Sequence, residues 1–449
     1  MFKEIQVYLS RFRLLIILTV LLILPLILSP AFARPYLDSK RAFLNFTMPL
    51  GIGAFLCSLL ISRDFLVRVK YLFLPALYVL FIFISALFSR NIELSLFAAL
   101  QQFLLVCGGF WLGFSLYGRR NELGKVLITI TAVAIFVSIH SFSQFIGHDF
   151  LYRFFPWKIV EGGLIHYRHI PGTLGNPDYV GGFLMILSFW ILLGCSWFNK
   201  KSVFLPVFFL TFFVTIITQT RSAIVGLLGG LLFLLLSFRK YQNIHFRKSL
   251  LIILSICFIM LLAGTYIVGN VFTGFTEFFL QRMHSAVMLM ESSFKVRLLH
   301  WQITTDMFLD NWLLGISPGM YRIEYLEYLL DFAGSPAAEP FENVIKSSGG
   351  RLAGEAHNDF FQIFAEYGLI AGAAFFFIIS WYFVSVAGIY RKKSSEGVFL
   401  VIFSALLIAV LIHAFFSFPF QLFVRAFYIW FTLGAAFSMI YNINRKHAE

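Results

Sequence analysis

Residues 355–389, EAHNDFFQIFAEYGLIAGAAFFFIISWYFVSVAGI, join a polar segment to a long apolar run. A helix of about 20 apolar residues crosses the hydrocarbon core of a bilayer, so this run is long enough to do so. Similar runs occur along the whole chain and predict twelve crossings, at residues 14–33, 43–62, 71–88, 94–117, 125–147, 178–198, 202–219, 222–238, 249–269, 358–389, 397–418 and 422–442. We therefore predict an all-α polytopic membrane protein with about twelve transmembrane helices.

The composition supports the same fold class. Hydrophobic residues make up 59% of the 449-residue chain, charged residues only 13%, and there are 58 phenylalanines. The mean hydropathy is +0.84. A soluble protein of this length has no core large enough to bury so much apolar surface.

The net charge of +13 is unevenly distributed. The segments at the chain ends and every second short loop hold 20 of the 35 Lys and Arg residues but only five of the 22 acidic ones. Basic residues concentrate in the cytoplasmic loops of membrane proteins. We therefore expect both termini in the cytoplasm, interpret the basic charge as a topology signal, and expect no nucleic-acid partner.

The N-terminus imitates a signal peptide. Lys3, Arg11 and Arg13 precede an apolar run that ends near the small residues Ala31 and Ala33. Because eleven further crossings follow, we expect an uncleaved first helix.

One long polar segment divides the chain. We expect an N-terminal transmembrane bundle of about nine helices at residues 1–269, a long outer loop at 270–357, and about three transmembrane helices at 358–449. Loops of this length are usually functional or carry their own secondary structure. Apolar spacing predicts an amphipathic helix at 294–309 and a short helix at 320–332. Residues 333–356 are rich in Gly, Ser and Ala, and we expect them to be mobile.

His357 and Asn358 stand at the predicted entry to the helix that follows this loop. A helix N-terminus favours anionic ligands, and histidine can take a proton from a sugar hydroxyl near neutral pH. The alternative is a solvated loop histidine that only caps the helix.

Two arginines are candidates for binding phosphate. Arg221 lies in a tight outer turn between two apolar segments. An arginine at membrane depth is rare and indicates a functional site, often one that binds phosphate. The alternative is an arginine whose side chain extends to the membrane interface without binding a ligand. Arg297, on the predicted loop helix, could bind the same ligand. The alternative is that the Arg297 side chain faces solvent or stacks on the ring of Trp301, which is four residues later on the same helix face.

A second polar region, residues 148–177, contains Arg168 and His169. Its histidine spacing is a weak metal signal, and the four cysteines lie in predicted helices without zinc-site spacing. We therefore expect no metal and no cofactor.

Several motifs occur in an order that resembles the O-antigen ligase family, a superfamily shared with O-antigen polymerases and bacterial protein O-oligosaccharyltransferases. They are GTLGNPD at 172–178, TRS at 220–222, Arg297 with Trp301, LGISPG at 314–319, and His357-Asn358 with Gly368 and Gly372. The resemblance extends over about 170–375.

The resemblance implies an inverting, metal-independent glycosyltransferase in the bacterial inner membrane, with its active site facing the periplasm. The donor would be a glycan on undecaprenyl pyrophosphate. Arg221 and Arg297 would bind the pyrophosphate, and His357 would act on the acceptor hydroxyl.

Accessory positions of the implied site are less defined. Asn176 and Asp178 fit either the site or a turn that starts a helix, and Trp301 fits packing better than a sugar platform. The remaining accessory candidates are Asn358, Arg168 and His169.

The acceptor separates the possible activities. Transfer to lipid A core is O-antigen ligation, transfer to a growing glycan is polymerisation, and transfer to protein is a third possibility. We expect ligation, although no single residue distinguishes the three. A transporter for the same lipid-linked glycan is the alternative of another class, but the predicted crossings are nearly free of Asp, Glu, Lys and Arg.

Overall fold

The computed structural model describes residues 2–29, 31–61, 65–116, 119–146, 148–151, 170–240, 251–263, 292–348, 353–391 and 397–446. Across these residues the regular structure is helical, without strands. The elements are α1 (Phe2–Ile23), α2 (Pro35–Leu60), α3 (Phe65–Leu87), α4 (Ile92–Phe103), η1 (Leu104–Gly108), α5 (Gly109–Phe114), α6 (Arg120–Phe145), α7 (Pro177–Phe198), α8 (Lys201–Ile217), α9 (Arg221–Lys240), α12 (Ser292–Asp310), α13 (Tyr321–Ala333), η2 (Pro336–Phe341), α14 (Glu342–Ser348), α15 (Asp359–Arg391), α16 (Gly397–Ala414) and α17 (Phe423–Lys446).

The expected class, a polytopic helical membrane protein, is confirmed. Within the described residues, nine helical segments are long and apolar enough to cross a membrane. Three shorter apolar helices, Lys201–Ile217, Arg221–Ser237 and Leu251–Ala263, fall at three further predicted crossings. Each of the twelve predicted crossings therefore overlaps an apolar helix.

The first crossing was predicted too far along the chain. We expected residues 14–33, whereas α1 ends at Ile23. Pro25 ends the helix because it has no N–H to donate to the carbonyl of Leu21. The hydroxyl of Tyr428 on α17 donates to that carbonyl instead.

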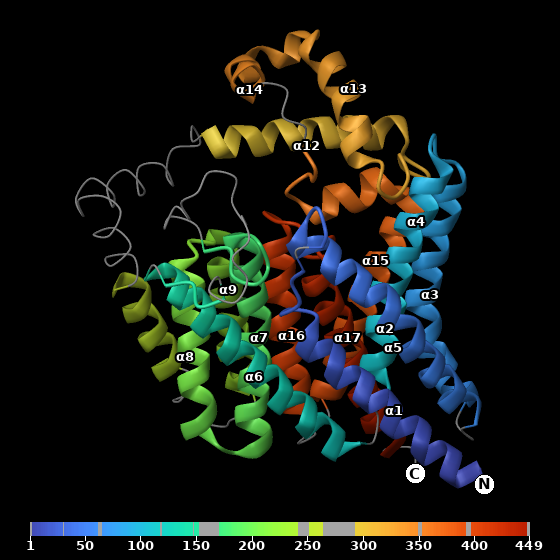
Figure 1. Ribbon diagram of the computed structural model, residues 1–449, viewed down its shortest axis with the longest axis vertical. Coiled ribbons are helices and arrows are strands. Elements are labelled where there is room, and N and C mark those ends of the chain that lie inside the picture. The colour runs from blue at the N-terminus through green and yellow to red at the C-terminus, as the bar shows by residue number, and fades with distance from the viewer. Residues whose placement is uncertain are drawn as a thin grey trace.

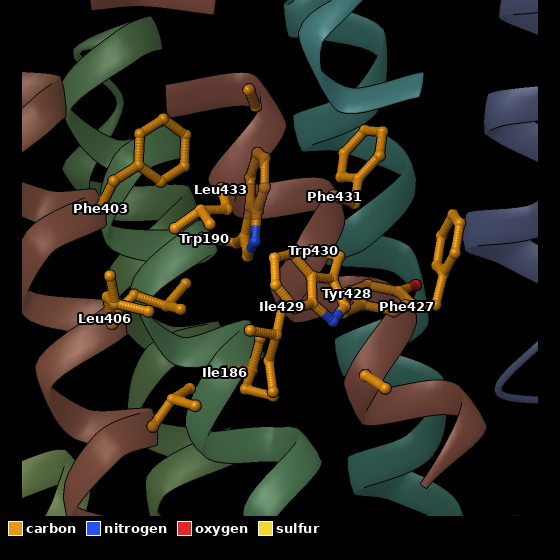
Figure 2. Close-up of a cluster of buried hydrophobic side chains, with 14 of the residues drawn as sticks. Ile186, Trp190, Phe403, Leu406, Phe427, Tyr428, Ile429, Trp430, Phe431 and Leu433 are labelled. Carbon is orange, nitrogen blue, oxygen red and sulfur yellow. The ribbon is translucent and has the colours of Figure 1, made fainter. Parts of the chain in front are cut away.

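Helix α17 lies in the middle of the bundle, between α16 and the α2–α5 group (Figure 1). Trp190 of α7 packs its ring 5.1 Å from that of Phe403 on α16 and 6.0 Å from that of Phe431 on α17. Its indole N–H donates to the hydroxyl of Thr432 at 2.9 Å. Figure 2 shows this cluster, which holds α7, α16 and α17 together.

The long loop forms a cap on one end of the bundle. Helix α12 lies across that end with α13 and α14 outside it, whereas α1 begins and α17 ends at the opposite end (Figure 1). The predicted helices at 294–309 and 320–332 are confirmed as α12 and α13. Within the segment 333–356, which we expected to be mobile, residues 336–348 form η2 and α14 and bury Ala338 and Val344 against the apolar side chains of the cap.

A break in α15 fixes the cap to the bundle. Gly368 has φ 74° and ψ −177°, a conformation essentially confined to glycine, and it interrupts the helix. The turn at residues 311–319 docks at this break. The N–H groups of Ile316 and Ser317 donate to the carbonyls of Ala365 and Glu366, and that of Leu369 donates to Trp312, at 2.8–2.9 Å.

The same turn is also attached to α3. The hydroxyl of Ser317 donates to the carbonyl of Ser85 at 2.8 Å, and the hydroxyl of Ser85 donates to the carbonyl of Leu314. The turn therefore joins α15 through main-chain hydrogen bonds and α3 through serine hydroxyls.

Gly368→Ala tests this joint. A Cβ at Gly368 would lie 2.3 Å from the carbonyl oxygen of Leu313, and alanine disfavours this φ and ψ. We expect the variant to lose about 2 kcal/mol or more of stability, measured as a lower melting temperature of the detergent-purified chain.

Gly388→Ala is the matched control on the same helix. No atom outside the adjoining backbone lies within 4 Å of a Cβ there, so we expect an unchanged or higher melting temperature. Equal melting temperatures of the two variants would contradict the proposed role of the break.

Candidate active site

His357 lies at the bundle end that the cap covers, in a constrained backbone conformation. Its φ is 55°, in the left-handed region that histidine adopts more readily than most residues. The ring stacks on that of His300, with centroids 6.1 Å apart and planes at 17°. The ring of Phe418 packs edge-on against it at 5.1 Å. Two aromatic contacts from different elements therefore fix the orientation of the imidazole.

Asn358 is the N-cap of α15, as the sequence predicted for a residue at a helix entry. Its side-chain oxygen accepts from the N–H groups of Phe360 and Phe361 at 3.0 and 3.2 Å. The side-chain oxygen of Gln362 accepts from the N–H of Ala356 at 3.0 Å. These bonds hold the chain on both sides of His357.

Arg297 and His300 come from α12, which crosses above this helix entry. Arg297 is half-buried, and its charge is close enough to disfavour protonation of both histidines. The Nδ1 atom of His300 lies 2.6 Å from the hydroxyl oxygen of Tyr325 on α13, so the cap holds this histidine in place.

The environment of His357 favours the neutral imidazole. Burial lowers the pKa of His357, the charge of Arg297 lowers it further, and Asp178 partly opposes both. A neutral imidazole has a lone pair that can accept a proton, which is what a general base requires near pH 7.

Arg221 begins α9 and is exposed at the same end of the bundle. The turn that precedes it is fixed by Thr220, whose hydroxyl donates to the carbonyl of Pro177 at 3.1 Å. The next residue, Ser222, lies 2.9 Å from Nδ1 of His413. Arg221 is therefore adjacent to a buried polar network that leads back to His357.

That network has Arg425 at its centre. The Nη1 atom of Arg425 lies 2.6 Å from Nε2 of His413 and 3.7 Å from Oδ2 of Asp178. The hydroxyl of Ser417 donates to the same carboxylate at 2.8 Å. A Cβ at Gly182 would lie 2.4 Å from Nη1 of Arg425, so only glycine leaves room for the network there.

Arg425 also contacts the surroundings of His357. Its guanidinium lies 5.9 Å from the ring centre of Phe418, which itself packs on His357, and 5.3 Å from that of Tyr179. The side chain is 1% exposed, and its Nε and Nη2 atoms have no hydrogen-bond partner among the described residues. Buried arginine nitrogens need acceptors, and a bound anion would supply them.

Sequence reasoning missed Arg425 and the buried acids Asp359 and Glu366. The signal was available, because an ionisable residue inside an apolar crossing indicates a functional site by default. Arg425 lies in a predicted crossing, yet that argument was applied to Arg221 and not to Arg425.

The accessory candidates have separate roles in the structure. Asn176 caps α7 by accepting from the N–H of Asp178 at 2.9 Å, and Asp178 belongs to the buried network. Trp301 packs 5.7 Å from Phe361 and 5.9 Å from Phe415, as a packing residue would. Arg168 and His169 lie outside the described residues.

The stacked histidines predict a pH dependence of stability. Burial lowers the pKa of His300 to about 4, with contributions from His357 when it is protonated and from the charge of Arg297. The unfolded chain binds a proton at this histidine below about pH 6.5, whereas the folded chain does not until about pH 4. Stability should therefore fall by about 2 kcal/mol between pH 7 and pH 5 through this residue alone.

His300→Gln isolates this contribution, because glutamine keeps a polar partner for Tyr325 and does not titrate. We expect the melting temperature of the variant to fall less between pH 7 and pH 5 than that of the parent. The same fall in both proteins would show that His300 is protonated in the folded state.

Residues 206–377 match the family model described as O-antigen ligase. No curated protein matches the chain. The match includes Arg221, Arg297 and His357, and it ends two residues beyond the predicted region of resemblance. The chain thus carries an O-antigen ligase family domain at residues 206–377, within a polytopic helical membrane protein.

Proposed function

We propose that this protein transfers a glycan from undecaprenyl pyrophosphate to an acceptor hydroxyl, and that the reaction is O-antigen ligation to lipid A core. The observation that carries the proposal is the position of His357, which two rings hold in place at the entry to α15, where burial and the charge of Arg297 lower its pKa. The family match supports the reaction class.

The proposed reaction is a direct displacement. His357 takes the proton of the acceptor hydroxyl while its oxygen forms a bond to the anomeric carbon of the donor. The bond from that carbon to the pyrophosphate oxygen breaks, and undecaprenyl pyrophosphate leaves with the electron pair. Attack opposite the leaving group inverts the anomeric configuration.

Arg221 and Arg297 would stabilise the leaving pyrophosphate. Negative charge develops on its oxygens as the bond breaks, and guanidinium groups are suited to it because they bind phosphate through two parallel hydrogen bonds. Two positive charges next to the leaving group would supply the stabilisation that a metal ion supplies in other phosphate sites, so we propose a reaction that needs no metal.

The proposed orientation follows from the charge pattern. The chain ends lie at the bundle end opposite to α12–α14 (Figure 1). If the basic loops are cytoplasmic, the cap and His357 face the periplasm. We therefore place the protein in the bacterial inner membrane, with a lipid-linked donor and the bilayer as its partners.

Deletion of the gene tests the acceptor. Ligation predicts long polymer stranded on the carrier lipid and bare lipid A core, when the two fractions are separated on a gel. Core bearing a single repeat unit would indicate a polymerase, and an unchanged pattern in both fractions would point to transfer to protein or to another exported polymer.

His357→Ala in the same strain tests the general base. We expect it to fail to restore polymer on lipid A core, because loss of a general base lowers the rate about 10²–10⁴-fold. His148→Ala, at an exposed histidine, is the control and should restore the polymer. Restoration by His357→Ala at normal membrane levels would rule out the assigned role.

Arg221→Lys tests the pyrophosphate-binding role. Lysine keeps the positive charge but loses the planar pair of donors, so we expect a large loss of transfer with normal membrane insertion. Arg445→Lys is the control, because α17 ends at the end of the bundle opposite to the candidate site, and it should keep full activity. Full activity of Arg221→Lys as well would indicate an arginine that only sets topology.

A further inference from the structure

A cavity of about 480 Å³ lies beside the candidate site, among the starts of α2, α13 and α17, the side of α4, and α15 with the segment before it. Arg221 and Arg297 do not line it, and neither does His357. The cavity is thus separate from the arginines that we assign to the donor pyrophosphate.

His357 is nevertheless close to this cavity. Glu355, two residues before the histidine, is part of the lining. Tyr179 and Arg425 line the cavity as well, and both contact Phe418, the ring that packs on His357. One aromatic ring therefore connects the cavity wall to the imidazole.

The lining is basic, with five Lys and Arg residues against two Glu residues. Arg41 is held at its guanidinium by Phe423 and Phe97, whose ring centres lie 5.2 and 5.9 Å away. The buried Nε of Arg41 and the buried Nε and Nη2 of Arg425 have no hydrogen-bond partner among the described residues. Two fixed guanidinium groups with unused donors form a site for an anion.

The two acids in the wall do not cancel this preference. Glu366 accepts from the N–H groups of Gly319 and Tyr321, so its carboxylate is bound to the scaffold. Burial, with a contribution from Glu366, raises the pKa of Glu355 to about 8. Glu355 is therefore mostly protonated at neutral pH, and its carboxylic acid can donate to a sugar oxygen.

The remaining polar lining suits a glycan. Gln101, Gln102 and Gln421 bring three side-chain amides to the cavity, and Tyr36 adds a phenol. Amides can donate to and accept from sugar hydroxyls at the same time. The wall thus combines anion-binding groups with groups that bind uncharged hydroxyls.

We propose that this cavity binds the acceptor glycan through a negatively charged group on its sugars, a phosphate or a carboxylate, and directs an acceptor hydroxyl towards His357. This inference rests on the proposed function. It separates the two substrates, with the donor pyrophosphate at Arg221 and Arg297 and the acceptor in the cavity lined by Arg41, Arg322 and Arg425.

Equilibrium binding to the purified full chain tests this separation without turnover. The probes are lipid A core oligosaccharide freed of its acyl chains, the same oligosaccharide after enzymatic removal of phosphate, and a prenyl pyrophosphate. We expect Arg41→Gln, and Arg322→Gln at the exposed residue of the rim, to weaken core binding about tenfold or more and to leave prenyl pyrophosphate binding unchanged.

Arg221→Gln should show the reverse pattern, with weaker prenyl pyrophosphate binding and unchanged core binding. Arg445→Gln is the matched control and should change neither. Arg322→Gln keeps the test usable if Arg41→Gln fails to fold, because Arg322 is exposed.

The phosphate-free core identifies the charged group. The charged group is a phosphate if removing phosphate from the core weakens its binding to the parent protein as much as the Arg41→Gln substitution weakens binding of the intact core. If the phosphate-free core binds as tightly as the intact core and remains sensitive to Arg41→Gln, the group is a carboxylate.

Two results would overturn the inference. The first is that core oligosaccharide does not bind the parent protein. The second is that Arg41→Gln and Arg322→Gln weaken only the binding of prenyl pyrophosphate. A chain that binds core through Arg41 but transfers no glycan would leave the cavity assignment intact and reject the proposed function. The two failures are therefore distinguishable.

Discussion

The main-chain bonds between the turn at 311–319 and the broken helix α15 determine the rest of the site. They are short-range contacts between backbone groups, and they hold the turn that follows α12 against α15. His357 comes from the start of α15, whereas Arg297 and His300 come from α12. The break at Gly368 allows this docking, and the docking places the side chains of α12 next to His357. The cap is therefore a structural part of the candidate active site.

The second constraint is the burial of charge. Asp178, His413 and Arg425 come from three helices whose apolar contacts hold them together around Trp190 (Figure 2). Removing a guanidinium from water is costly unless its donors find partners, and Arg425 keeps two nitrogens without one in the described structure. A stable apolar core thus supports a polar site that a ligand would complete. This is the expected arrangement where part of the stability of a fold is given up for binding.

Local sequence patterns predicted the local structure. The apolar runs identified the long apolar helices among the described residues, the spacing in the long loop identified α12 and α13, and the position of Asn358 identified a helix entry. Contacts between distant segments were beyond this reasoning. Arg425 and Asp178 are 247 residues apart, and no periodicity relates them. Gly368 was noted within a motif, but a glycine in an apolar run does not reveal that another segment docks against it.

The central claim is that the chain is a transferase with His357 at its reacting centre. The most direct measurement is glycan transfer by the purified chain in detergent, supplied with glycan-linked undecaprenyl pyrophosphate and lipid A core. The account predicts one released undecaprenyl pyrophosphate for each glycan joined to the core, with no membrane gradient present. No transfer in detergent, together with movement of the intact lipid-linked glycan across proteoliposomes, would contradict it and identify a transporter.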